Sequence, residues 1–413
     1  MRMPPGPLQS RNFRLLLACN VTSVTGTAVA IVAIPFAVLA IGGSAADVGY
    51  VAAAVMVPAL IFPLGGVVAD RLARHQVMMA ANILQAVAQA AAAALVLTGR
   101  AQVWELAVLA FARGVGYVFY FPAEAGLLPQ TVPAEQRAAA NAMDRIGRGA
   151  SQIGGSALGG VLVGLAGPGW GLAVDAASFA IAAALRAGMR FPALPPVART
   201  GMLRELREGW RDFISRRWFW TIVLALGLIV AVSAAATSVL GPLVTHAQLG
   251  GARSWGLILA AYAAGAVLGG IIMLRFRPER ILLVPMLLVP ALSAFLFALA
   301  VPLPVAWVAG TAFLAGGCLE VFWVSWATAM QQEIPPAKLS RLSSYDLFAS
   351  FTLAPVGAVV AGPAANAFGT PAVLTAGGLL IVLLTVTVLL IPEVRHMRRQ
   401  VHAHPDQADP PTP

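Results

Sequence analysis

The stretch GGVVADRLARHQ, residues 65–76, separates two long segments that carry no charged side chain. Residues 48–69 and 76–99 are uncharged and mostly apolar, whereas one acid and two arginines lie close together between them. About 20 consecutive apolar residues are enough to span a bilayer as an α-helix. The stretch is therefore predicted to be a short polar loop between two membrane-spanning helices.

The rest of the chain repeats this pattern. Of its 413 residues, 59% are hydrophobic and 11% are charged, and the mean hydropathy is +0.82. Charged residues make up about a quarter of an ordinary globular protein. Long uncharged segments recur, and turn signals such as Pro302-Leu303-Pro304 divide the longest of them. The predicted fold class is an all-α membrane protein with twelve transmembrane helices.

The basic residues predict the orientation of these helices. Of the 27 lysines and arginines, 22 fall in the two tails and in alternate loops, with Arg186 counted as a loop residue after the sixth helix. Because short cytoplasmic loops are rich in Lys and Arg, these loops and both termini are expected in the cytoplasm. The net charge of +10 is thereby explained as a topology signal. Nucleic-acid binding is not expected, since it would need a basic soluble domain.

The two halves of the chain share one plan. An offset of 202 residues aligns LLPQTVPAEQRAAANAMD with AMQQEIPPAKLSRLSSYD, and so pairs Asp144 with Asp346. Parallel repeats of this kind occur in secondary transporters, whose substrate site lies at mid-membrane between the repeats. The predicted parts are an N-terminal six-helix half, a linker with an amphipathic cytoplasmic helix, a C-terminal six-helix half and a disordered cytoplasmic tail: residues 1–190, 191–217, 218–391 and 392–413.

The loop quoted above closely resembles the G-x-x-x-D-R-x-G-R-R signature of the major facilitator superfamily, with Ala73 in place of the second Gly and His75 in place of the last Arg. Other stretches look like the bacterial enterobactin-exporter-like and macrolide-efflux (transmembrane secretion effector) branch of that superfamily. These stretches are Arg11-Asn-Phe-Arg14, Pro122-Ala123, Asp175-Ala-Ala-Ser178-Phe179 and residues 249–270. The resemblance implies the two-half major facilitator fold, a bacterial cytoplasmic membrane location and export.

The same resemblance implies a gate on the cytoplasmic side. Asp70 would dock on the N-terminus of the eleventh helix, near Ser343, because a helix N-terminus attracts a carboxylate. Arg71 and Arg74 would pair with acids at nearby helix ends, although each arginine could instead only obey the positive-inside rule. The predicted gating residues are Gly66, Asp70, Arg71, Arg74, Glu124, Asp144 and Asp346.

A motif in the fifth helix resembles the G-P-x-x-G-G signature of antiporters, with Ser156 in the Pro position. The alternative is close helix packing, because the same glycines form G-x-x-x-G patterns. The motif residues are Gly155, Ser156, Gly159 and Gly160.

Two charged residues are predicted near the middle of membrane spans. An ionised side chain there costs at least about 2.5 to 3.5 kcal/mol, so Arg113 and Glu320 are expected to face a cavity and each other. Glu320 is interpreted as the protonatable group, whereas Asp175 is expected nearer the outer face, and polar residues such as Asn20 could simply join helices. The candidates for the substrate and proton cavity are Asn20, Arg113, Tyr117, Tyr120, Asp175, Glu320 and Trp323.

The predicted function is proton-coupled efflux of a small amphiphilic molecule, such as a drug, siderophore or natural product. The proton gradient would supply the energy without a cofactor, and the partners would be the substrate and membrane lipid, with the protein a monomer. Two alternatives remain: an importer of an anionic metabolite with Arg113 as its ligand, and a receptor or scaffold that transports nothing. No P-loop surrounds Lys338, the one lysine, and no hydrolase motif is present, so neither an ATP-driven pump nor an enzyme is expected.

Overall fold

The computed structural model describes residues 6–62, 72–189, 211, 213–276, 278–301, 303–335, 342, 346, 348, 350 and 352–399. Gly66, Asp70 and Arg71, most of the linker, the start of the eleventh span and residues 400–413 lie outside this range. The described residues are helical apart from turns and one isolated β-bridge between Arg280 and Arg398. The predicted all-α fold class is confirmed.

The helices follow the apolar segments of the sequence. In the N-terminal half they are α1 (Arg11–Ala40), α2 (Ala45–Met56), α4 (Arg74–Leu97), α5 (Val103–Leu127), α6 (Arg137–Ala166) and α7 (Pro168–Ala187). In the C-terminal half they are α9 (Arg217–Ala235), α10 (Gly241–Gln248), α11 (Ala252–Arg275), α12 (Leu283–Leu288), α13 (Ala291–Ala300), α14 (Val305–Glu333), α16 (Ala354–Phe368), α17 (Thr370–Leu389) and α18 (Pro392–His396). Single turns are η1 (Pro7–Gln9), η2 (Val57–Ile61), η3 (Leu128–Gln130), η4 (Ala134–Gln136) and the π-turn η5 (Ala236–Leu240).

Local sequence sets where these helices begin and end. The side chains of Ser44 and Asp47 form a capping box at the N-terminus of α2, directly after the turn that follows α1. Gly167 and Gly369, which the repeat offset aligns, both have positive φ values, 91° and 85°, and each precedes a new helix. Only glycine adopts this backbone conformation without strain. The two halves therefore share the same turn at this position.

Ten helical segments of the described chain are long and apolar enough to cross a membrane. Two shorter apolar segments, Ala45–Ile61 and Ala354–Phe368, occupy the places of the second and eleventh predicted spans, and both adjoin residues outside the described range. The arrangement is therefore that of a multi-span membrane protein. We call the side on which α1 and α6 begin the basic side, because Arg11, Arg74 and Arg137 lie there at helix starts.

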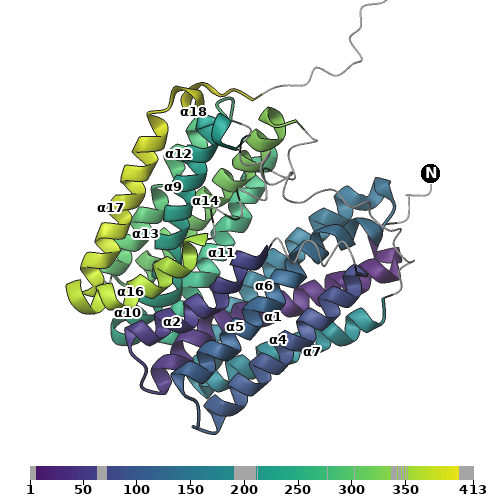
Figure 1. Ribbon diagram of the computed structural model, residues 1–413, viewed down its shortest axis with the longest axis vertical. Helices are drawn as coiled ribbons and strands as arrows, with labels where there is room; N and C mark the ends of the chain where they lie inside the picture. Colours follow the sequence, from purple (N-terminus) through teal and green to yellow (C-terminus); the bar gives the residue numbers. More distant parts are fainter. Residues whose placement is uncertain are drawn as a thin grey trace, which may run out of the picture.

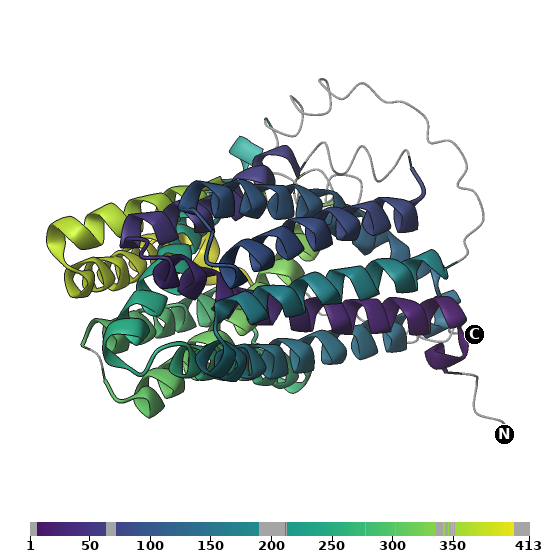
Figure 2. The same cartoon turned by 90° about the horizontal axis from the view of Figure 1, so that it is seen from below.

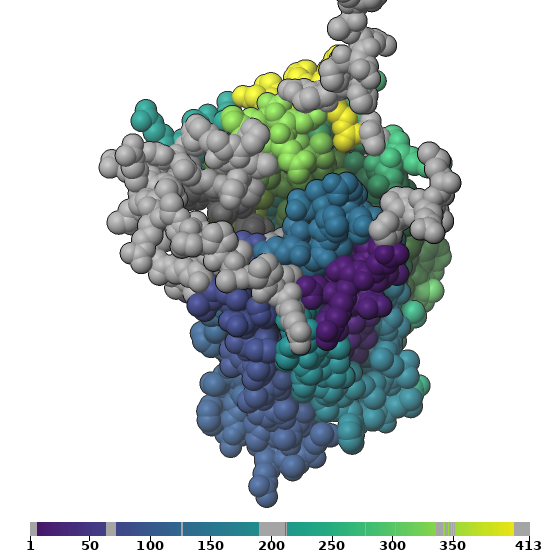
Figure 3. Space-filling view, turned by 90° about the vertical axis from the view of Figure 1, so that its right-hand side faces the viewer, coloured from purple at the N-terminus to yellow at the C-terminus, as the bar shows by residue number. Residues whose placement is uncertain are grey.

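The two halves are separate bundles that meet through a few helices. The N-terminal helices run side by side in Figure 2, and Figure 3 shows each half keeping to its own part of the molecule. Between the halves, α6 packs against α11 and α16 packs against α2. These two interfaces are equivalent under the repeat, since α6 and α16 hold the aligned glycines Gly160 and Gly362.

Close approaches between the halves lie toward the side opposite the basic side. A Cβ atom built on Gly160 would be 2.9 Å from Cα of Gly256, and one on Gly362 would be 2.5 Å from Cα of Ala46. Gly49 meets the backbone of Ala358 in the same region. From this junction the two halves diverge toward the basic side, as Figure 1 shows.

Two expectations need correction. Residues 392–399 were assigned to a disordered tail, but they form α18 and then bridge to the loop before α12, where Ile281 N–H donates to the carbonyl of Met397. The buried Val394 anchors this segment. Arg186 was counted among the loop arginines, but it lies in the last turn of α7 and is completely buried. Within the linker, Phe213 is buried against Phe219.

Candidate functional site

A buried ion pair lies in the middle of the N-terminal half. Arg113 of α5 pairs with Asp175 of α7, with 3.3 Å between Nε and Oδ2, and both side chains are buried. Gln89 of α4 donates from Nε2 to the same carboxylate oxygen at 2.6 Å, and Thr27 of α1 accepts a long hydrogen bond from Arg113. Four helices therefore meet at one buried acid–base pair, which offsets the cost of placing either charge in a span.

This pair corrects the expected partnership of Arg113 with Glu320. The partner of Arg113 is Asp175, which is wholly buried between α4, α5 and α7. The guanidinium also lies over the ring of Phe179, 5.8 Å from its centroid. Because Arg113 is neutralised within its own half, it offers no open cation to an anionic substrate in this conformation.

Nearer the basic side, six side chains form a closed ring of hydrogen bonds, which we call the polar ring: Asn20, Tyr120, Glu124, Asp144, Arg148 and Arg186. Arg186 donates to the hydroxyl of Tyr120 at 2.8 Å, and that hydroxyl donates to Oε1 of Glu124 at 3.0 Å. Arg148 then contacts Glu124.

Asp144 and Asn20 complete the polar ring. Arg148 Nε donates to Asp144 at 2.7 Å, Asn20 Nδ2 donates to the other oxygen of Asp144 at 2.8 Å, and Asn20 accepts from Arg186 at 3.4 Å. Two acids and two arginines balance each other, and the members come from α1, α5, α6 and α7. The polar ring therefore fastens four helices of one half to each other.

The polar ring bears on three sequence-based expectations. The pairing of Asp144 with Arg148 along one helix is confirmed. Glu124 and Asp144, expected to pair with Arg71 and Arg74, are both contacted by Arg148. Arg71 lies outside the described residues, and Arg74 makes interactions of its own. Asn20, expected in the cavity, is buried in the polar ring, which favours its alternative role in joining helices.

Sequence reasoning missed Arg186. A positive-inside count treats any arginine at the end of a span as a loop residue, yet this guanidinium lies 4.9 Å from the Tyr120 ring centroid and is fully buried. The available signal was position: Arg186 falls at helical spacing from Ser178 and Ala182, within α7, before the first residue of the linker.

We expect Tyr120→Phe to lower the free energy of unfolding by about 1 to 3 kcal/mol, because it removes the hydroxyl that joins Arg186 to Glu124 and leaves buried polar groups unsatisfied. An SDS-unfolding titration of the purified protein measures this loss. Tyr117→Phe is the matched control: Tyr117 lies one turn away, is 50% exposed and packs against Phe62 and Phe121. Equal stability of the two variants would contradict the role given to the polar ring.

The C-terminal half has a different version of the polar ring. Asp346, which aligns with Asp144, accepts from Trp326 Nε1 at 3.1 Å and from Ser350 at 3.4 Å. Trp326 and Ser350 stand at the repeat positions of Glu124 and Arg148. The indole stacks on Phe219 and Phe322, whose rings lie 5.5 Å and 6.4 Å away. Aromatic packing thus replaces the charges of the first half.

Glu320 lies near the middle of α14 and is partly exposed. Among the described residues it forms no direct ion pair, and it faces Gly270 of α11, where a Cβ would be 4.0 Å from Oε1. Trp323, one turn further along α14, is also partly exposed and packs edge-on against Phe322. Glu320 is therefore an acid within a span that has no directly paired charge among the described residues.

The fifth-helix motif packs α6 on two sides at once. A Cβ on Gly155 would be 2.7 Å from the Ala28 side chain, and one on Gly159 would be 2.9 Å from Cα of Val29. Both glycines therefore allow α1 to pack closely against α6. Gly160 packs against Gly256 of α11 in the other half, and Ser156 is completely buried. These contacts favour the close-packing interpretation of the motif.

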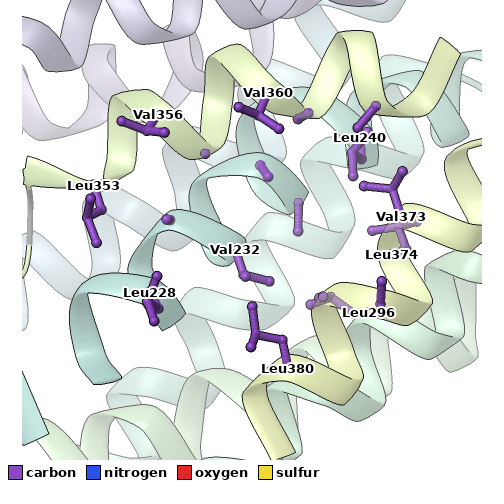
Figure 4. A pocket seen from close by; sticks show the side chains of 18 residues that line it. Leu228, Val232, Leu240, Leu296, Leu353, Val356, Val360, Val373, Leu374 and Leu380 are labelled. Atoms are coloured by element: carbon purple, nitrogen blue, oxygen red, sulfur yellow. The ribbon is translucent and has the colours of Figure 1, made fainter. Parts of the chain in front are cut away.

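An apolar pocket of about 360 Å³ lies inside the C-terminal half, between α9, α13, α16 and α17. Figure 4 shows Leu228 and Val232 of α9 opposite Leu380 of α17, with Val356 and Val360 of α16 along another wall. All 18 lining residues are apolar, and none was a candidate from the sequence. The pocket suits a hydrocarbon group, and no lining side chain could orient a polar one.

The fold and the buried charges together define a polytopic membrane protein built from two six-span halves. The chain belongs to the transmembrane secretion effector family, whose model matches residues 3–411, and the major facilitator resemblance is thereby confirmed.

Known proteins agree with this assignment. The chain is 27% identical to the multidrug efflux pump Tap of Mycolicibacterium fortuitum, over 93% of this chain and 96% of that protein. It is 23% identical to macrolide efflux protein A of Streptococcus pyogenes, over 93% and 97% of the two chains. The nucleoside transporter NupG has the same fold, with a TM-score of 0.70 at 15% identity, over 93% of this chain and 98% of that one.

Proposed function

We propose that this protein is a proton-coupled exporter of small amphiphilic molecules that works by alternating access. The relatives named as multidrug and macrolide efflux pumps support export of amphiphiles. The observation that carries the coupling is Glu320, an acid within a span that is partly exposed and forms no direct ion pair among the described residues, whereas Asp346 is buried against Trp326. Such a group can bind and release a proton without breaking an ion pair, whereas Asp175 and Asp144 cannot.

The basic side is the cytoplasmic side in this proposal, because short loops rich in arginine stay in the cytoplasm. The close approaches of Gly160 to Gly256 and of Gly362 to Ala46 lie on the opposite side, so in this proposal the outer side is the closed one. Rotation of one half against the other about the α6–α11 and α16–α2 interfaces would open the opposite side. The ion pair and the polar ring of the N-terminal half make that half one rigid body during the motion.

The substrate class is inferred from the exposed side chains near mid-span, most of which are apolar or aromatic. Apart from Glu320, the exposed side chains near mid-span include Tyr117, Phe121 and Leu314, which present aromatic and aliphatic surface. Apolar contacts bind a hydrophobic body without fixing its shape, which suits several related molecules. The alternative of an importer of anions receives no support, because its ligand, Arg113, is already neutralised by Asp175.

Inside-out vesicles containing the protein are expected to accumulate a radiolabelled macrolide or a fluorescent amphiphilic cation when their interior is made acidic. A protonophore should abolish the accumulation, because the proton gradient supplies the energy. No accumulation of either probe under a pH gradient would contradict the proposed function. A cysteine at exposed Gln248, in a protein without Cys19 and Cys318, fixes the sidedness, since it should be shielded from an impermeant thiol reagent in these vesicles.

A further inference from the structure

The interface between α6 and α11 keeps one register along much of its length. Gly160 meets Gly256, and a Cβ on Gly149 would be 2.7 Å from the Val267 side chain. The spacing from Gly149 to Gly160 equals the spacing from Gly256 to Val267, so the two helices run antiparallel without slipping. This register allows the facing residue on α11 to be read for each position of α6.

One turn before Gly149, on the same face of α6, lies Arg145, which is exposed. The register places it opposite Ile271, next to Gly270. Glu320 of α14 faces Gly270 within the C-terminal half, with its Cγ 3.9 Å from where a Cβ on that glycine would be. Gly270, next to the α11 position that the register places opposite Arg145, therefore contacts Glu320 without adding a side chain of its own.

The electrostatic surroundings of Glu320 are simple. Arg145 of α6 and Tyr262 of α11 lie within electrostatic reach of it, and α11 also carries Arg253 and Arg275 near its two ends. The other helices packed against α14 in the described chain, α12 and α13, contain no charged residue. The charge that balances Glu320 therefore comes from the opposite half of the molecule, at longer range than a direct ion pair.

We propose that Arg145 is the positioning residue that controls proton release from Glu320, an inference that rests on the proposed exporter function. A nearby cation favours the ionised form of a carboxyl group. Because the two charges belong to different halves, their separation depends on how the halves are rotated. The proton affinity of Glu320 is thereby tied to conformation, and in the conformation open to the basic side Arg145 promotes release of the proton there.

The test is the pH profile of substrate exchange in proteoliposomes, with pH varied on the basic side. Arg145→Gln should move the profile upward by about half a pH unit to one unit, since the proton is held more tightly without the cation. Arg145→Lys should restore the wild-type profile. Arg137→Gln is the matched control, because it removes an exposed arginine from the start of the same helix and should move nothing.

Two results would overturn this inference. One is an Arg145→Gln profile that superimposes on that of Arg137→Gln. The other is a shift that persists in a Glu320→Gln background, which would mean that Arg145 acts on another group, such as an anionic part of the substrate. If the wild-type exchange rate does not depend on pH, the proposed proton coupling is contradicted instead. The failure of this inference can therefore be distinguished from the failure of the proposed function.

Discussion

Glu320→Gln is expected to abolish pH-driven export while leaving substrate counterflow close to the wild-type rate. Glutamine keeps the shape of the side chain but cannot exchange a proton, so the step that links the gradient to substrate movement is lost. Counterflow needs only the substrate-loaded halves to rotate, and the contacts that join the halves, such as Gly160 with Gly256, are unchanged. Reconstituted vesicles measure both rates on the same protein preparation.

Glu135→Gln is the matched control for that experiment, because Glu135 is an exposed acid in the η4 turn, outside the spans. It should retain wild-type export. A Glu320→Gln protein that still concentrates substrate under a pH difference would show that another group carries the proton.

The second large effect is expected at the Arg113–Asp175 pair. Arg113→Met or Asp175→Leu alone should lower the free energy of unfolding by about 3 to 5 kcal/mol, because each leaves one buried charge without its partner. The double substitution should recover most of that loss, since it removes both charges and fills the space with apolar atoms. SDS-unfolding titrations of the three variants measure the coupling between the two positions.

Arg100→Met is the control for the loss of an arginine, because Arg100 is exposed at the end of the α4–α5 turn. It should cost little. If the double variant were as unstable as the single ones, the pair would not be the stabilising unit that its geometry indicates. Stable single variants that no longer transport would instead make Asp175 a coupling residue.

The helices and the repeat could be predicted from the sequence because both depend on local pattern. Apolar runs must form helices in a bilayer, since no other partner exists for their backbone groups. The offset that aligns Asp144 with Asp346 also aligns the structural roles of the two acids, because each accepts a hydrogen bond from the residue four positions later. Spacing along one helix is enough to predict such a contact.

The partners of buried charges could not be predicted in the same way. From the sequence, either Asp175 or Glu320 could be the partner of Arg113. The packing of α5 against α7 makes Asp175 the partner. Arg186 resembles a loop residue in the sequence because it lies at the end of a span. Its burial depends on a hydrogen bond to Tyr120, which is distant in sequence. Helix-to-helix contacts of this kind are set by rotation about each helix axis, which hydropathy does not specify.

The apolar pocket between α9 and α17 was also outside the reach of the sequence. Its walls are ordinary span residues such as Leu228 and Leu380, which resemble lipid-facing positions in composition. Two of the lining residues, Gly357 and Gly377, are glycines and contribute no side chain to fill the space between them. No periodicity in the chain distinguishes these positions from their neighbours.

The central claim is that substrate movement out and proton movement in are one exchange carried by Glu320. The most direct measurement is the internal pH of proteoliposomes that contain a pH-sensitive dye and no imposed gradient, followed after substrate is added. With the wild-type protein we expect proton movement opposite to the substrate, and with Glu320→Gln we expect substrate binding without any pH change. A wild-type protein that moves substrate with no accompanying pH change would contradict the claim.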